Sequence, residues 1–238
     1  MKYSGTEHQL CEEFHCRADK HGWLFYPETC GWDILLVRQG VQIGVQAKTS
    51  ANCHVIYQAM AGVRYRNDTA NLIADRKVRC GPHFRAVLVP EEADFVSISH
   101  WLGLWVFGTH TFGDALLESP AGQPRFRWEP EKLHTLPEVI PQVPAGVPSP
   151  VSLTPWKQRA LKLLARAQIK GVTSRDANEL KVDLQLFKDR SWLRKVGMEG
   201  RRELWVLESD PPHKRPDQQH PKEFQHYLER EMMGCAIA

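Results

Sequence analysis

The chain has 238 residues, of which 42% are hydrophobic and 25% are charged, and these values exclude a protein that is disordered throughout. A chain of this length can bury one sizeable core, or a medium-sized domain together with a small one. No apolar run approaches the ~20 residues that a membrane-spanning helix needs. Residues 1–7 lack the apolar core of a signal peptide. We therefore expect a cytoplasmic protein with no membrane partner.

The net charge of +3 is unevenly distributed along the chain. Residues 1–110 carry 11 Lys/Arg and 11 Asp/Glu, whereas residues 151–208 carry 13 Lys/Arg against 7 Asp/Glu. A local excess of this size favours a module that binds a polyanion, although a solvated basic surface has the same composition. The six cysteines form no Cys-x-x-Cys pair, so in a reducing compartment we expect free thiols.

The first 50 residues predict one helix followed by three strands. Residues 6–21 have apolar side chains at helical spacing and are followed by Gly22, a helix stop. Residues 23–26 form a short aromatic segment typical of a strand and are followed by a proline. Residues 31–37 and 41–48 have the character of two further strands, and the polar turn between them predicts a hairpin.

The next part of the chain alternates between helix and strand. Asn52 can cap a helix that runs towards Tyr65, and residues 84–89 are typical of a buried strand. A short helix over 91–102 and an apolar strand over 104–107 follow. The predicted order is α-β-β-β-α-β-α-β. This order favours an α/β fold in which helices cover the faces of a mixed sheet.

Prolines then accumulate over residues 111–150, which hold eight of the sixteen in the chain. A stretch so rich in proline disfavours regular elements, because each proline removes a backbone donor and restricts the residue before it. The composition predicts a stiff linker between a first domain, residues 1–110, and a second domain.

Residues 151–208 predict three short helices closed by a β-hairpin. Thr154 and Pro155 provide an N-cap and a first helical position for a helix that reaches 168. A second helix ends near Leu180, and a third spans about 184–194. A hairpin with a basic tip completes the pattern of a small winged helix-turn-helix domain. The remaining residues, 209–238, predict a polar tail with a helix over 223–233.

Three polar residues can meet where the second and third strands of the first domain lie side by side. Gln46 and Lys48 share one face of their strand, because strand side chains repeat every two residues. A hairpin of this length can bring Asp33 beside them. The resulting cluster of a carboxylate, an amide oxygen and an ammonium could hold a divalent metal and polarise a phosphate.

The first 110 residues resemble the PD-(D/E)XK nuclease superfamily, whose restriction-endonuclease-like core has the order α-β-β-β-α-β. Its motif is an Asp on the second strand followed by Glu-x-Lys on the third. In this sequence Asp33 matches the Asp, Gln46 occupies the Glu position and Lys48 matches the Lys. Trp32 stands where the family usually has proline. The change to Gln46 removes one negative charge, and some active members of the family carry Gln-x-Lys.

The resemblance implies a catalytic site that hydrolyses phosphodiester bonds in DNA with Mg²⁺, or with Mn²⁺ in its place. The metal ligands that it implies are Glu7, Asp33, Gln46 and the backbone carbonyl of Ala47. Glu7 would come from the first helix, with Glu12 as the alternative. Lys48 would orient the attacking water or stabilise charge on the phosphate. The setting could be phage or mobile-element DNA processing, repair or restriction.

The second domain would bind the DNA. In a winged helix the third helix enters the major groove, and the wing follows the backbone or the minor groove. The side chains expected to contact DNA are Gln185, Lys188, Arg190, Arg201 and Arg202. A homodimer or a partner protein is expected, because one site per chain commonly needs a second to cut both strands. Two alternatives are an inactive DNA-binding protein that keeps the nuclease fold and an assembly factor that binds protein.

Overall fold

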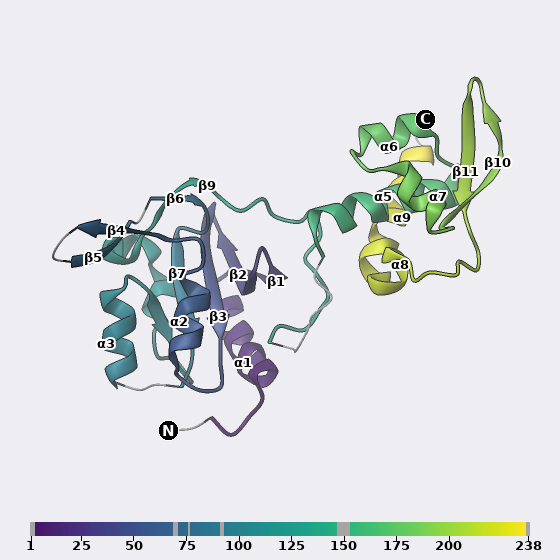
Figure 1. Ribbon diagram of the computed structural model, residues 1–238. Helices are drawn as coiled ribbons and strands as arrows, with labels where there is room; N and C mark the ends of the chain where they lie inside the picture. The colour runs from purple at the N-terminus through teal and green to yellow at the C-terminus, as the bar shows by residue number, and fades with distance from the viewer. Residues whose placement is uncertain (1–2, 69–70, 76, 91–92, 147–152, 237–238) are drawn as a thin grey trace. The chain divides into compact units, whose positions relative to one another are not determined.

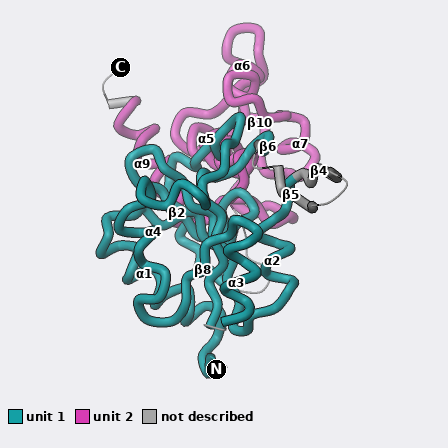
Figure 2. Tube along the Cα trace, turned by 90° about the vertical axis from the view of Figure 1, so that its left-hand side faces the viewer, with its two compact units in different colours: residues 1–152 teal, residues 153–238 magenta. Residues whose placement is uncertain are grey.

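The computed structural model describes residues 3–68, 71–75, 77–90, 93–146 and 153–236. Only the backbone is described for residues 235 and 236 and for the described residues between 64 and 77. The chain divides into two compact units, residues 1–152 and residues 153–238 (Figure 2). Each unit has hydrophobic core residues of its own.

The first unit is built on a mixed five-stranded sheet (Figure 1). In spatial order its strands are β1 (Leu24–Thr29), β2 (Trp32–Arg38), β3 (Val41–Ala47), β7 (Phe84–Leu88) and β8 (Trp105–Phe107). The first three are antiparallel neighbours, whereas β3, β7 and β8 run parallel to one another. Parallel neighbours require crossover connections, and each crossover here contains a helix. The predicted α/β class with a mixed sheet is confirmed.

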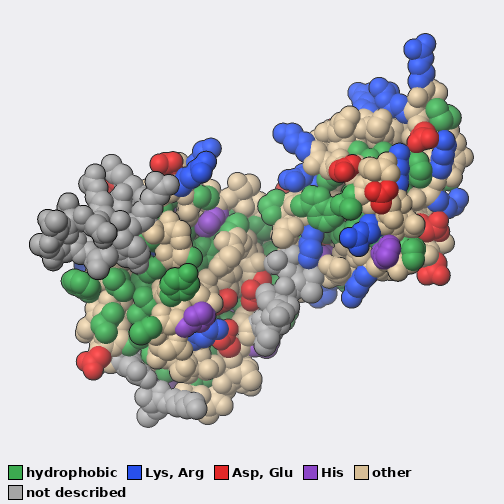
Figure 3. All heavy atoms as spheres, viewed as in Figure 1, with side chains coloured by type: hydrophobic (Ala, Val, Ile, Leu, Met, Phe, Trp, Pro, Cys, Tyr) green, Lys and Arg blue, Asp and Glu red, His purple; other side chains and the backbone are tan. Residues whose placement is uncertain are grey.

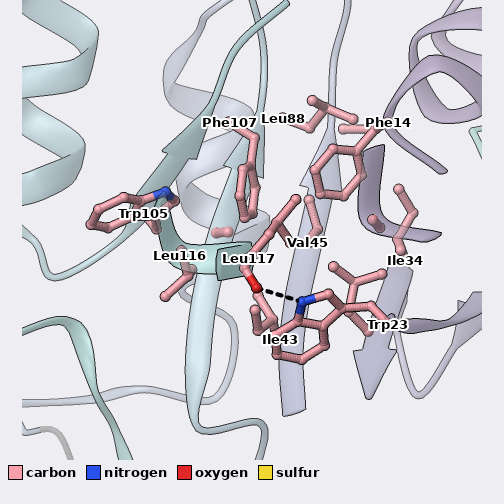
Figure 4. Packing of buried hydrophobic residues seen from close by; sticks show 14 of the residues in the cluster. Phe14, Trp23, Ile34, Ile43, Val45, Leu88, Trp105, Phe107, Leu116 and Leu117 are labelled. Atoms are coloured by element: carbon pink, nitrogen blue, oxygen red, sulfur yellow. Dashed lines mark hydrogen bonds between the residues drawn. The ribbon is translucent and has the colours of Figure 1, made fainter. Parts of the chain in front are cut away.

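Helices cover both faces of this sheet. α1 (Glu7–Lys20) and α4 (Ala115–Glu118) contribute to the core on one face, and α2 (Cys53–Ala59) and α3 (Ala93–Trp101) to the core on the other. Figure 4 shows the first of these cores, in which the indole Nε1 of Trp23 donates to the carbonyl of Leu117 at 2.9 Å. The helix predicted to run towards Tyr65 ends at Ala59, so that prediction is too long.

Two tight turns connect the antiparallel strands. Cys30 and Gly31 link β1 to β2 with φ values of 58° and 84°, and Gln39 and Gly40 link β2 to β3 with φ values of 50° and 79°. Positive φ at both central residues is what a two-residue hairpin loop of type I′ requires, and glycine adopts it without strain. These turns fix which residues of neighbouring strands face each other.

Four strands lie outside the main sheet in segments where the sequence predicts none. β4 (Arg64–Asp68) and β5 (Asn71–Asp75) pair in antiparallel orientation, and β6 (Lys77–Cys80) pairs in parallel with β9 (Glu129–Lys132). The β6–β9 pair joins residues about fifty positions apart, and such long-range pairing leaves no local periodicity in the sequence.

The proposed linker over 111–150 is wrong for residues 111–146, which belong to the first unit. Leu116 and Leu117 are fully buried, Trp128 is 1% exposed, and its indole Nε1 donates to the Gly103 carbonyl at 3.2 Å. Pro120 and Pro124 begin two short 3₁₀ helices, Pro120–Gly122 and Pro124–Phe126, and Pro130 lies in the short strand β9. A missing backbone donor is tolerated at the first position of a helix and in an edge strand. Residues 147–150 of the predicted linker lie outside the described residues.

The second unit contains α5 (Pro155–Ile169), α6 (Ser174–Glu179), α7 (Leu184–Asp189) and a hairpin of β10 (Leu193–Glu199) and β11 (Arg202–Leu207). Thr154 caps α5 by accepting from the Lys157 N–H at 3.2 Å, and Val172 forms an isolated bridge with Trp205. The predicted third helix is too long, because Ser191 has a φ of 53° and a strand begins at Leu193.

The C-terminal residues belong to the second unit, where the sequence predicts a polar tail over 209–238 with a helix. α8 (Pro216–Gln219) and α9 (Pro221–Ala236) both contact α5. Tyr227 of α9 is 2% exposed, and Phe224 packs against the core. The predicted helix over 223–233 falls within α9. In the described part of the chain, no helix is both long and apolar enough to cross a membrane.

Candidate functional site

The side chain of Asp33 makes the hydrogen bond that follows the last backbone pair between β2 and β3. The regular register ends with Ile34 opposite Val45, and the next N–H on that side of β3, from Ala47, donates to the Asp33 Oδ2 at 2.8 Å. The carboxylate therefore takes the position of a strand carbonyl. Burial raises the pKa of Asp33, whereas the Ala47 hydrogen bond and nearby Lys48 act to lower it. The other carboxylate oxygen, Oδ1, is the one that could bind a ligand.

Lys48 lies directly after β3 and makes an ion pair with Glu7. Its Nζ is 2.8 Å from the Glu7 Oε2, and both side chains are about three-quarters buried. The backbone N–H of Lys48 donates to Leu88, so the sheet fixes the root of the side chain. Thr6 caps α1 and places Glu7 in its first turn. The structure thus brings Glu7 to Lys48, whereas the alternative helix carboxylate, Glu12, is exposed.

Gln46 is 4% exposed, and its amide nitrogen donates to the Gly31 carbonyl at 2.8 Å. This bond ties β3 to the β1–β2 turn, two residues before Asp33. The amide therefore has a structural partner where the family motif has an acid. Only its oxygen, Oε1, remains to serve as a ligand.

Glu28 is a third acidic residue of the site, and the sequence reasoning missed it. The register of β1 and β2 pairs Pro27 with Ile34 and Thr29 with Trp32, which places Glu28 opposite Asp33. Burial, followed by the charge of Asp33, raises the pKa of Glu28 to about 7. The residue could have been found by extending the strand past Pro27, because proline is tolerated in an edge strand.

A segment near the end of the first unit packs against this acidic cluster. The Gly146 N–H donates to the Glu28 Oε1 at 3.0 Å, and the Ala145 carbonyl is 3.1 Å from the Nδ1 of His8. A Cβ at Gly146 would lie 2.9 Å from the Glu7 carbonyl carbon and oxygen, so only glycine fits. The Cys11 thiol lies next to Gly146, and its burial and the surrounding carboxylates raise its pKa.

The oxygen donors of this cluster suit Mg²⁺, a hard cation that prefers oxygen ligands. Among the described residues, no group of three or more His, Cys, Asp and Glu side chains is arranged to hold a metal ion. Mg²⁺ in proteins commonly uses one or two carboxylates and completes its shell with water and substrate phosphates. Asp33, with the carbonyl oxygens of Gln46 and Ala47, fits that pattern.

In the second unit, α7 presents fewer unengaged side chains than the sequence suggests. The Gln185 amide donates to Asp189 at 2.7 Å. The Lys188 Nζ is 3.3 Å from the Glu203 Oε2 and lies 4.4 Å from the centre of the Trp205 ring. Two of the predicted DNA contacts are therefore engaged within the unit. Sequence reasoning could not see the partners of Lys188, because they lie on β11.

The other predicted contacts, Arg190, Arg201 and Arg202, are exposed. Figure 3 shows Lys and Arg side chains over the visible face of this unit and at the end of its hairpin. A groove of ≈ 620 Å³ between α5, α6 and the hairpin is lined by Arg175 and Arg202, among others. Arg166 also lines the groove, but Glu179 and Glu231 bind its guanidinium at 2.9 and 2.8 Å, which marks it as a structural residue.

Comparison of the chain with models of protein families, with curated proteins and with solved structures gives no match.

Proposed function

We propose that the protein is a DNA endonuclease that requires Mg²⁺, with its catalytic site in the first unit. The observation that carries the proposal is the arrangement at the end of β3, where Asp33 accepts from Ala47 and Lys48 lies against Glu7. These residues have the spacing and strand positions of the PD-(D/E)XK motif. The mixed sheet and its flanking helices suit such a core.

Each residue of the site would have its own role in the reaction. Asp33, through Oδ1, and the carbonyl oxygens of Gln46 and Ala47 would hold the cation. A bound Mg²⁺ supplies Lewis-acid stabilisation of the phosphate charge. The Lys48 ammonium would turn from Glu7 towards the phosphate and stabilise the negative charge that develops there. Glu7 would then accept a hydrogen bond from the attacking water and orient it.

The second unit would bind DNA as a winged helix. Its element order, three helices followed by a hairpin, supports this assignment, as does the charge of residues 151–208. We place the main phosphate contacts on the exposed arginines Arg190, Arg201 and Arg202. We also propose that two chains, or one chain and a partner protein, act together when both strands are cut.

The test is cleavage of plasmid and branched DNA with Mg²⁺ or Mn²⁺ by the wild type, Asp33→Asn and Lys48→Ala. Each substitution should reduce the rate by about 10²-fold or more, the size expected for loss of a group that stabilises transition-state charge. Glu12→Gln, which removes an exposed carboxylate from the same helix as Glu7, is the matched control and should cleave normally. Cleavage that survives both site substitutions would overturn the assignment.

The second candidate is a DNA-binding protein that keeps this fold without cleaving. It is favoured by Gln46, whose amide is bound to Gly31 where the motif has an acid. In that case the wild type shifts DNA in a gel but does not cut it with either metal.

A further inference from the structure

Two exposed thiols of the first unit contact the same short stretch of chain. Cys30 lies in the β1–β2 turn and Cys80 at the end of β6. The Cys30 Sγ donates to the Thr135 carbonyl at 3.7 Å, and the Cys80 Sγ donates to the Leu133 carbonyl at 4.0 Å. The residue between these carbonyls, His134, is held in place by Gln42, which bonds to both its N–H and its C=O. The two thiols therefore flank one fixed residue.

The imidazole of His134 also faces Cys80. Its Nδ1 lies 3.7 Å from the Cys80 Sγ, and its Nε2 accepts from the indole Nε1 of Trp32 at 3.0 Å. Burial and the charge of Arg85 lower the pKa of His134, so the ring is neutral. An indole nitrogen can only donate, which leaves the ring proton on Nδ1. His134 can therefore donate a hydrogen bond to a thiolate at Cys80.

We propose that Cys30 and Cys80 form a disulfide bond when the protein meets a peroxide. The Cys80 thiolate attacks one peroxide oxygen, the O–O bond breaks, and water leaves after protonation, giving a sulfenic acid. The Cys30 thiolate then attacks that sulfur, the S–S bond forms, the S–O bond breaks, and a second water leaves. Two thiols lose two protons and two electrons, and the peroxide is reduced to two waters.

The order of the two steps follows from the surroundings of each thiol. Cys30 is exposed as a residue but its sulfur is partly desolvated, and this desolvation, followed by the charge of Cys80, raises the pKa of Cys30. This thiol therefore forms its thiolate less readily. Cys80 has the imidazole N–H beside it and is the first to react. A thiol is a weak hydrogen-bond donor, so the bonds from the two thiols to the Thr135 and Leu133 carbonyls are easily broken. The two side chains can then turn towards each other.

The bond would form next to the candidate site. Cys30 directly precedes Gly31, whose carbonyl holds the Gln46 amide. A disulfide would fasten this turn to β6. The inference concerns the thiols alone and stands whether or not the protein cleaves DNA.

The experiment treats the reduced full-length protein with hydrogen peroxide, blocks remaining thiols with iodoacetamide, and maps unreduced peptides by mass spectrometry. The expected result is a peptide pair linked through Cys30 and Cys80. Cys16 and Cys53 are also exposed, and Cys16→Ser with Cys53→Ser, the matched control, should leave the linked pair unchanged. Absence of the linked pair in the wild type, or equal oxidation of Cys16 and Cys53, would overturn the proposal.

Two variants test the order of reaction. Cys30→Ser should trap the sulfenic acid at Cys80, detected as a dimedone adduct, whereas Cys80→Ser should give no adduct at Cys30. His134→Ala should slow formation of the linked pair several-fold. Thermal unfolding of each variant checks that it is folded. If a variant does not fold, the peptide map of the wild type still tests the proposal. An adduct at Cys30 but not at Cys80 would contradict the mechanism.

Discussion

Two carboxylates face each other across β1 and β2, those of Glu28 and Asp33. Burial, followed by the charge of Asp33, raises the pKa of Glu28, and burial together with the charge of Glu7 raises the pKa of Asp33. The Gly146 N–H and the Ala47 N–H each donate to one of them and offset part of that effect. The first unit therefore holds two acids where their charged forms are destabilised. Groups with shifted pKa values are common at functional sites.

Glu28 should make the stability of the first unit depend on pH. The carboxyl titrates near its ordinary value of 4.5 in the unfolded chain and near 7 in the folded protein. Between these values the folded protein holds a proton that the unfolded chain releases, so the free energy of unfolding falls as the pH rises from 4.5 to about 7. Glu28→Gln should remove this decrease and, above pH 7, stabilise the unit by about 1 kcal/mol.

The measurement is urea unfolding of the wild type and Glu28→Gln at several pH values across this window. Glu12→Gln removes an exposed carboxylate and should follow the wild type. Parallel profiles for the wild type and Glu28→Gln would show that Glu28 does not titrate there.

Strand spacing made part of the site predictable. Asp33 and Lys48 could be chosen because alternation and hairpin length are local properties of the sequence. Glu28 was missed because the predicted strand stops before Pro27, whereas β1 continues through this proline to Thr29. The Gln46–Gly31 hydrogen bond and the Lys188–Glu203 ion pair could not be predicted from local sequence patterns. Each joins residues that are well separated along the chain.

At the scale of elements, apolar periodicity located the helices and strands of the main sheet. It failed for β9, which has the sequence Glu-Pro-Glu-Lys and shows no alternation of apolar residues. This strand exists because β6 pairs with it and because Trp128, just before it, is buried. Tertiary contacts override local propensity in such cases.

Trp128 therefore gives a direct test of whether residues 111–146 stabilise the first unit. The side chain packs beside the Arg85 guanidinium, 5.2 Å from the ring centre. Trp128→Ala should lower the free energy of unfolding of this unit by about 3–5 kcal/mol, the usual range for loss of a buried aromatic side chain. Urea unfolding followed by circular dichroism measures the change.

Trp101→Ala is the matched control, because this tryptophan is 77% exposed. It should change the free energy of unfolding by less than about 0.5 kcal/mol. Equal effects of the two substitutions would mean that residues 111–146 contribute no more to stability than a linker does.

At the scale of the whole molecule, the two units differ in charge. The first 110 residues are balanced, and the basic excess lies in residues 151–208. The structure extends this second unit to the end of the chain and so adds acidic residues to it, among them Glu231, which binds Arg166. If the second unit binds DNA as proposed, the exposed arginines of its hairpin are the clearest place for phosphate contacts.

Arg201→Ala with Arg202→Ala should weaken DNA binding at low salt. If each arginine meets one phosphate, the slope of log affinity against log salt should become shallower by about 2. Fluorescence anisotropy with duplex DNA over a range of salt concentrations measures both quantities.

Lys214→Ala with Lys222→Ala removes the same charge from exposed positions outside the hairpin. If both double variants lose affinity equally, net charge explains the binding and the hairpin has no special role. An unchanged affinity and slope in the arginine variant would remove the hairpin from the DNA contact.

Gly146 lies near the end of the first unit, and its backbone N–H donates to Glu28. The preceding residue contacts His8, in the same helical turn as Glu7. A displacement of residues 145 and 146 would therefore act directly on the Glu28 carboxylate and on the first turn of α1. The same two backbone contacts would transmit strain to Glu28 on one strand and to the helical turn that carries Glu7.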